Sequence, residues 1–253
     1  MSQWSLPSSM LVNEQSSDGS NPTTGAIDTT SANMIIVVIS RDNSCTSTTS
    51  LYDNLGSSWL LVKSQSIIGT GAAVDMFVGY GASLKVGPVH TFNPNVAGCS
   101  GGSTGVYSSI IVQGVICSST PSPDQSISAA SASGVTSVQA GLLSPGANNE
   151  LIFSTACMSI GSGTWSGIDS GFTLLDGLIQ QPNAYGLALG YLIQSVASST
   201  NPTWTYAPAG HTAAINASFS YPQVGGGAAA GTGVSFSTSA GASFTRSAGV
   251  RFS

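Results

Sequence analysis

The sequence predicts an all-β protein built as an antiparallel β-sandwich, and three observations lead to this prediction. Between Ser31 and Pro222, short runs rich in β-branched and aromatic residues alternate with Gly, Ser, Asn and Pro punctuation. Several runs alternate strictly between apolar and polar residues, as half-buried strands do. No stretch of the sequence has the pattern of a long amphipathic helix, because glycines and β-branched residues interrupt every candidate. Many short strands at near-regular spacing indicate a sandwich or a barrel.

The predicted strands follow one another along the chain with short connections. They are Met34–Ser40, Ser58–Ser66, Val74–Tyr80, Val86–Phe92, Tyr107–Cys117, Val135–Leu143, Glu150–Ile160, Phe172–Gln180, Tyr185–Val196, Thr203–Tyr206 and Thr212–Tyr221. The run Met34–Ile39 is apolar on both faces and predicts a central strand. Two faces are predicted to be apolar by alternation: one carries Tyr185, Leu187, Leu189, Tyr191 and Ile193, and the other carries Ile215, Ala217, Phe219 and Tyr221.

The composition predicts a polar but weakly charged surface. Only 6% of the residues are charged, compared with roughly 25% in ordinary soluble domains. The 41% of hydrophobic residues suffices for a core, so Ser, Thr, Asn, Gln and Gly must cover the outside. Such a surface favours an extracellular or virion protein that buries area against neighbours, and hence a homo-oligomer; the alternative is a neutral monomer. The net charge of −5 argues against a nucleic-acid partner.

Neither a leader segment nor a membrane span is expected. Residues Met1 to Val12 lack the basic start and apolar stretch of a signal peptide, and the longest apolar run, Met34–Ile39, is too short to cross a bilayer. The cysteines lie far apart without a CxxC pair, at Cys45, Cys99, Cys117 and Cys157. Buried free thiols are therefore favoured over zinc ligands or a disulfide framework.

Composition and pattern divide the chain into four segments: residues 1–30, an N-terminal extension that could include one edge strand; residues 31–222, the sandwich; residues 223–232, a Gly/Ala linker; and residues 233–253, an arm of eight-residue repeats. In the arm, Phe236, Phe244 and Phe252 occupy the same slot of successive repeats. Because eight is even, all three side chains would lie on one face of an extended chain. Together with Arg246 and Arg251, they form the predicted assembly interface. A partner subunit is the favoured surface for this arm, and the edge of its own domain is the alternative.

The order of several landmarks resembles the jelly-roll β-sandwich domains of phage virion and bacterial surface proteins. An apolar strand follows Ala32-Asn33, and a D-x-x-G-x-x-W-x-L-V hairpin follows at Asp53–Val62. Later landmarks are A-N-N-E-L-I-F at Ala147–Phe153, G-F-T-L-L at Gly171–Leu175 and A-A-I-x-A-x-F at Ala213–Phe219. The resemblance covers about residues 31–222, apart from an insert around Gly98–Gly105. It implies a jelly-roll-like sandwich with a structural or binding role, and it supplies no catalytic residues.

No pattern in the sequence predicts a catalytic, cofactor-binding or metal site. The G-x-S-x-G match at Gly98–Gly102 has loop residues on both sides rather than a strand and a helix, and Gly69-Thr70-Gly71 lacks a following helix. His90 and His211 have no acidic residue at a ligand-like spacing. The carboxylates are scattered through the sequence, at Asp53, Asp75, Asp124, Glu150, Asp169 and Asp176. Trp59 is expected to be a core or hairpin anchor, and Trp165 is the best candidate for an aromatic ligand contact at a loop tip.

These observations predict a non-enzymatic phage virion protein, most simply a capsid decoration or tail-associated component. It would assemble through the C-terminal arm with copies of itself, a trimer being plausible, and with other virion proteins. Its location would be the virion, assembled in the host cytoplasm. The first alternative is a carbohydrate-binding or adhesin module of a tail fibre or cell surface, with a glycan as partner. A glycoside-processing enzyme is the less favoured alternative, since it needs two converging carboxylates.

Overall fold

The computed structural model describes residues 4–16, 21–42, 50–67, 72–95, 108–159, 163–178 and 186–221. The chain divides into two units, residues 1–222 and residues 223–253. Everything described belongs to the first unit. The linker and the repeat arm, with Phe236, Phe244, Arg246, Arg251 and Phe252, lie outside the described residues.

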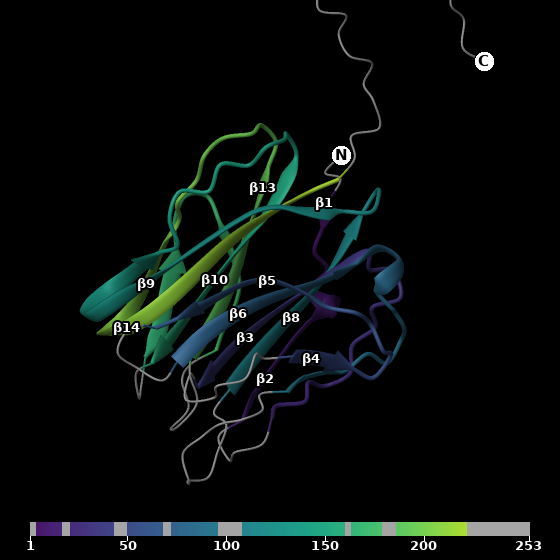
Figure 1. Ribbon diagram of the computed structural model, residues 1–253, viewed down its shortest axis with the longest axis horizontal. Helices are drawn as coiled ribbons and strands as arrows, with labels where there is room; N and C mark the ends of the chain where they lie inside the picture. The colour runs from purple at the N-terminus through teal and green to yellow at the C-terminus, as the bar shows by residue number, and fades with distance from the viewer. Residues whose placement is uncertain are drawn as a thin grey trace, which may run out of the picture. The chain divides into compact units, whose positions relative to one another are not determined.

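One six-stranded antiparallel sheet is formed by the first half of the chain. Its strand order is β2 and β1 along one edge, then β8, β3, β6 and β5 (Figure 1). The strands span Trp4–Ser5 (β1), Leu11–Ser16 (β2), Met34–Asp42 (β3), Leu60–Ser66 (β5), Ala72–Tyr80 (β6) and Ser108–Cys117 (β8). We call this sheet the N-sheet.

A second six-stranded antiparallel sheet is formed by the second half, and we call it the C-sheet. β9 and β11 pair with β14, which is followed by β10, β13 and β12. The strands span Ser122–Gln139 (β9), Glu150–Ser159 (β10), Thr164–Ile168 (β11), Thr173–Leu178 (β12), Gly186–Gln194 (β13) and Thr203–Ser220 (β14). The chain therefore completes one sheet before it starts the other, and the strands of the two sheets do not alternate along the sequence.

The two sheets face each other as the layers of a sandwich (Figure 1). Their inner faces share one apolar core, to which β3 contributes Ile36 and Val38, and β10 contributes Leu151 and Phe153. The described residues of both apolar faces predicted by alternation belong to this core, including Leu187 and Leu189 of β13 and Ile215 and Phe219 of β14. Tyr185 lies outside the described residues. The predicted central strand is confirmed as well, because Met34–Ile39 is completely buried between β6 and β8.

Each sheet also carries a covering layer on its outer face. Over the N-sheet lies a small two-stranded sheet of β4 (Ser50–Asp53) and β7 (Phe92–Asn95), with residues 21–32 beside it. Phe92 of this layer packs in a cluster with Ile35 and Phe77 of the N-sheet. Over the C-sheet, Trp204 and Trp165 pack against Ala156 and Met158, and Leu143 and Phe172 pack against Ile152.

The predicted all-β class and the antiparallel sandwich are confirmed, and two short 3-10 turns, Ser8–Met10 (η1) and Gly81–Ser83 (η2), are the helical elements among the described residues. The strand predicted at Val86–Phe92 is wrong over most of its length. Its backbone instead bonds residues 27–29 through His90 and Gly87, and Pro88 lacks the N–H that a ladder needs. The predicted strands Thr203–Tyr206 and Thr212–Tyr221 are one strand, β14, irregular at Ala207–Gly210.

Candidate functional site

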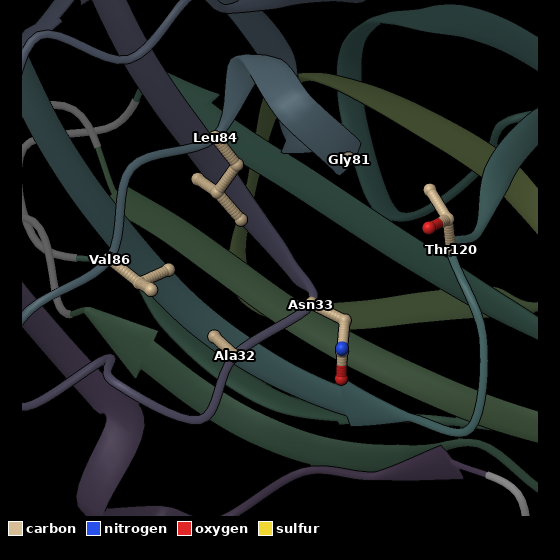
Figure 2. Close-up of a pocket in the computed structure, with 6 residues that line it drawn as sticks. All are labelled: Ala32, Asn33, Gly81, Leu84, Val86 and Thr120. Atoms are coloured by element: carbon tan, nitrogen blue, oxygen red, sulfur yellow. The ribbon is translucent and has the colours of Figure 1, made fainter.

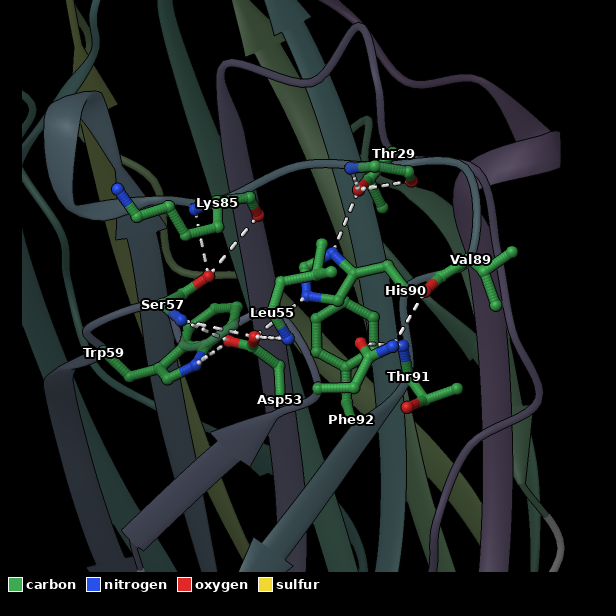
Figure 3. A network of polar contacts seen from close by, with 12 residues as sticks. Thr29, Asp53, Leu55, Ser57, Trp59, Lys85, Val89, His90, Thr91 and Phe92 are labelled. Atoms are coloured by element: carbon green, nitrogen blue, oxygen red, sulfur yellow. Dashed lines mark hydrogen bonds and ion pairs between the residues drawn. The ribbon is translucent and has the colours of Figure 1, made fainter.

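A buried polar network holds the covering layer of the N-sheet, and Asp53 is its centre (Figure 3). The carboxylate ends β4 and accepts hydrogen bonds from Leu55 N at 2.7 Å, from Ser57 N at 3.1 Å and from Trp59 Nε1 at 2.8 Å. These bonds fix the D-x-x-G-x-x-W turn, in which Gly56 adopts a positive φ of 78°. Burial alone would raise the pKa of Asp53, but the hydrogen bonds from Ser57, Trp59 and Leu55 together lower it. The predicted anchoring role of Trp59 therefore has a polar component that the sequence pattern does not reveal.

His90 joins this carboxylate to the segment that precedes β3. Its Nε2 lies 3.4 Å from Asp53 Oδ1, and its Nδ1 lies 2.9 Å from Thr29 Oγ1. The ring is fully buried and stacks at 4.2 Å on Phe92. Burial lowers the pKa of His90, and the Asp53 carboxylate offsets only part of this effect. In a neutral ring Nδ1 can accept from the threonine hydroxyl, while Nε2 faces the carboxylate at 3.4 Å without forming a hydrogen bond.

The order Thr29–His90–Asp53 is that of a nucleophile, a base and an orienting acid. Thr29, however, is itself fully buried, and its hydroxyl contacts Gly87 through both the carbonyl oxygen and the N–H. A substrate could reach this hydroxyl only if the covering layer opened. In the described conformation the network joins three segments: the residues before β3, the turn after β4 and the residues before β7.

A pair of carboxyl groups, Asp124 and Glu150, meets on the outer side of the C-sheet. Asp124 accepts from Gly146 N at 2.8 Å and from Ser218 Oγ at 3.3 Å, and Glu150 accepts from Ala147 N at 2.7 Å. Glu150 is fully buried. Burial raises the pKa of Glu150, hydrogen bonds from Ser218 and Ala147 lower it, and the Asp124 charge raises it further, so the result is an increase.

This carboxyl pair was not predicted, because its members lie 26 positions apart and the A-N-N-E-L-I-F landmark around Glu150 indicates a strand rather than a site. The Asp124 charge acts on the pKa of Glu150, while each carboxylate accepts a hydrogen bond from the backbone of the loop at residues 146–147. The pair therefore joins β9, β10 and the loop at Gly146.

A third buried polar contact lies on the outer face of the N-sheet. Arg41 Nε donates to Asp75 Oδ2 at 2.6 Å, and Ser64 Oγ donates to the other carboxylate oxygen. Arg41 and Asp75 lie in or next to the apolar runs that form β3 and β6. Opposite charges in two buried strands could have predicted a buried ion pair.

A shallow pocket of about 250 Å³ opens beside the start of β3. Figure 2 shows Leu84, Val86 and Ala32 on one side of it and Thr120 on the other. The remaining lining residues are Asn33, whose Oδ1 accepts from Cys117 N at 2.8 Å, and Gly81. The walls carry no titratable group, so the pocket offers apolar contact and hydrogen bonds but no acid–base chemistry.

The structure places Trp165 in strand β11 rather than at a loop tip. Its ring packs edge-on against Trp204 and Tyr206, each at 5.6 Å. The loop placement was therefore wrong, because the Gly/Ser residues around Trp165 conceal a short strand, while its contact with a ligand stays a prediction. Trp165 is half-buried, whereas Trp4 and Trp204 are buried.

The other residues considered in the sequence are the second histidine, the G-x-S-x-G match and the cysteines. His211 lies within β14, and the match at Gly98–Gly102 lies outside the described residues. Cys117 and Cys157 are buried free thiols, as predicted, and burial raises the pKa of each. Cys45 and Cys99 are not among the described residues. Within the described part of the chain, no three His, Cys, Asp or Glu side chains gather in a way that could hold a metal ion. No helix in that part is long and apolar enough to span a membrane.

Comparisons of this chain with models of protein families, with curated proteins and with solved structures find no match.

Proposed function

We propose that the protein is a non-enzymatic structural component of a phage virion, a capsid decoration or tail-associated subunit that assembles through its C-terminal arm. The observation that carries the proposal is the contrast between the arm and the rest of the chain. Residues 233–253 contain Arg246, Arg251 and no acidic residue, whereas the remainder has three basic and ten acidic residues and a formal charge of −7. A cationic, aromatic arm is thus complementary to the acidic body of a neighbouring copy.

The engagement of the buried ionisable groups supports a structural role. Asp53 and His90 join the covering layer to the N-sheet, Arg41 pairs with Asp75, and Asp124 and Glu150 each bond the backbone of the loop at residues 146–147. Each of these groups is committed to holding strands together. A subunit that withstands assembly forces profits from such cross-links, because breaking a buried pair costs roughly 3–5 kcal/mol.

Truncation after Pro222 tests the proposal. The shortened chain keeps every described strand, so we expect it to fold with the same unfolding midpoint and to lose oligomerisation completely. Analytical ultracentrifugation of both proteins measures the assembly. Two full-length variants test whether the aromatic side chains, rather than the length of the arm, are required for assembly. Replacing Phe236, Phe244 and Phe252 by Ser should abolish assembly. Replacing Ser237 and Ser247 by Ala should leave assembly unchanged. Normal assembly of the truncated chain would contradict the proposal.

A glycan-binding module remains the second candidate, and one exposed side chain favours it. The side chain of Tyr52 in β4 is 56% exposed. Among the described residues, the other large hydrophobic side chains that are exposed are all aliphatic. Tyr52 pairs across the strands with Asn93, and Asn54 follows two residues later. An exposed ring suits stacking on a sugar face, and the amides of Asn54 and Asn93 beside it are held in place by hydrogen bonds within the protein. If glycan-array binding exists, Tyr52→Ala should abolish it, whereas Tyr52→Phe should retain most of it; binding that survives Tyr52→Ala would exclude this surface.

A further inference from the structure

The two sheets have the same internal plan. Each half of the chain supplies strands in the order a, b, c, d, e, and each sheet arranges them as a-e-b-d-c. In the N-sheet these strands are β2, β3, β5, β6 and β8, and in the C-sheet they are β9, β10, β12, β13 and β14. Every pairing in both sheets is antiparallel. Five strands can be arranged in a sheet in many different orders. The same order in both sheets therefore indicates that the two halves have a common origin.

The residue register repeats as well. In the N-sheet, one row of paired residues crosses the strands through Asn13, Ile111, Val38, Met76 and Lys63. The corresponding row of the C-sheet crosses through Ser128, Ile215, Thr155, Leu189 and Asp176. Strand c is bulged at the same point of both rows, between Leu61 and Lys63 in β5 and between Leu174 and Asp176 in β12. Bulges are specific features of a fold rather than defects, so a shared bulge is strong evidence of equivalence.

The covering layers share irregular details that a sandwich does not require. An isolated antiparallel bridge joins the a–b and d–e connections in each half, at Ile27 and His90 and at Leu143 and Thr200.

The turn that precedes strand c repeats a side-chain contact. Asn54 N donates to Thr91 O, and Thr91 N donates to Asn54 Oδ1 at 3.0 Å. Asp169 N likewise donates to Thr203 O, and Thr203 N donates to Asp169 Oδ1 at 2.7 Å.

The halves meet as symmetry-related partners do. In a two-fold pair, each contact of element i with element j recurs as j with i. β5 contacts β9, and Ser128 Oγ donates to Gln65 Oε1 at 2.8 Å between them. At the opposite seam Asn13, the residue equivalent to Ser128, donates to Asp176 and joins β2 to β12. This seam is less extensive than the contact of β5 with β9, so the two-fold relation is approximate. β6 contacts β14, and β8 contacts β13.

We infer that the chain is an internally duplicated, covalently joined dimer, in which the inner face of each sheet is an interaction surface that fits a copy of itself. The partner for each surface is therefore a half-chain of this same fold. This inference is independent of the proposed virion role.

The halves differ at the positions that form the Asp53–His90 contact. Asp53 pairs with Phe92 in the small sheet, and the equivalent pair in the C-sheet is Ile168 and Trp204. By the isolated bridges His90 corresponds to Thr200, and the second half has two more residues between this bridge and the residue equivalent to Thr91, which is Thr203. The frame is thus compatible with an aliphatic and a hydroxyl side chain at these places, so the Asp53–His90 contact is specific to the first half.

Cleavage of the intact protein at the junction tests the inference. A protease site placed in residues 118–121, between β8 and β9, separates the halves after native cleavage, denaturation and purification. We expect each half to refold as a homodimer of twice its own mass, and the mixture to yield the heterodimer, as measured by ultracentrifugation and native mass spectrometry. Cleavage in residues 195–202, inside the second half, serves as the control and should give fragments that do not refold separately. Halves that fold as monomers, or that pair only with each other, would overturn the inference.

A circular permutant decides the case in which the separate halves aggregate. The rings of Trp4 and Tyr221 lie 5.1 Å apart, so the end of β14 reaches β1 as the end of β8 reaches β9. In this permutant a four-residue linker joins residue 221 to residue 4, and the chain is opened at residues 118–121. The second half then precedes the first half in the sequence. We expect the permutant to keep the parent's cooperative unfolding transition and near-UV spectrum. A permutant without a cooperative transition would overturn the inference.

Discussion

At the scale of single residues, the burial of His90 has a consequence for stability. The ring lies between the Asp53 carboxylate and the Thr29 hydroxyl, and its pKa is lowered in the folded protein because burial disfavours the charged form. The unfolded chain therefore binds a proton more readily than the folded chain below the ordinary histidine pKa of about 6.5. Since stability rises with pH wherever the unfolded state binds more protons, His90 favours unfolding in acid.

We expect the contribution of His90 to the free energy of unfolding to be constant above about pH 6.5. Below that pH the contribution should decrease until the pH reaches the lowered pKa of His90 in the folded state. His90→Gln should remove this part of the pH dependence, because glutamine does not titrate. Urea denaturation at several pH values between 7 and 4.5 measures the slope. His211→Gln, which keeps the buried ring, is the control and should retain the loss. An unchanged acid profile in His90→Gln would contradict the assignment.

At the scale of secondary-structure elements, the sequence predicts most strands of the sandwich, because alternation and punctuation report burial directly. Met34–Ser40 and Val74–Tyr80 correspond to β3 and β6 within two residues at either end. The failures have physical causes. Val86–Phe92 alternates like a strand but contains Pro88, and its backbone bonds are made to residues 27–29. β4 and β11 were missed because each is short and shows no long apolar pattern. The prediction Val135–Leu143 covers only the end of β9, which begins at Ser122 in a polar stretch.

The N-terminal segment illustrates how packing fixes an element that its sequence leaves open. β1, η1 and β2 lie along β8, and Met10 packs directly over Gly114. A β-carbon at Gly114 would lie 2.9 Å from Met10 Cβ, closer than packed carbon atoms tolerate.

We expect Gly114→Ala to reduce the free energy of unfolding by roughly 1–3 kcal/mol, because the N-terminal segment must shift away from β8. Urea denaturation measures the loss, and protease sensitivity near Met10 should increase. Gly25→Ala is the matched control, since the nearest atom to its new β-carbon would be Val12 Cγ2 at 3.9 Å. Equal stability of the two variants would show that η1 does not depend on this close approach.

At the scale of the whole molecule, the sequence predicts the class of fold but not the division of the chain into equivalent sheets. The halves share register and strand order, while their residues differ at nearly every paired position, as the rows through Val38 and Thr155 illustrate. The two halves have different side chains at equivalent positions but the same backbone geometry. Because a sequence records the side chains and not the backbone geometry, it does not reveal the relation. The carboxyl pair of Asp124 and Glu150 was missed for a related reason, since only the pairing of β9 and β10 with β14 brings them together.

The charge distribution of the whole chain makes the proposed assembly sensitive to salt. The body carries a formal charge of −7 and the arm +2. Because salt screens exposed charges beyond about 8–10 Å at physiological strength, raising NaCl from about 50 to about 500 mM should weaken assembly. The double variant Arg246→Gln, Arg251→Gln should assemble more weakly at low salt and lose most of this dependence. Sedimentation equilibrium at several salt concentrations measures both effects. Lys63→Gln with Lys85→Gln removes the same charge from the body and should retain the salt dependence. Assembly that strengthens with salt in the parent chain would instead indicate an interface dominated by the phenylalanine side chains.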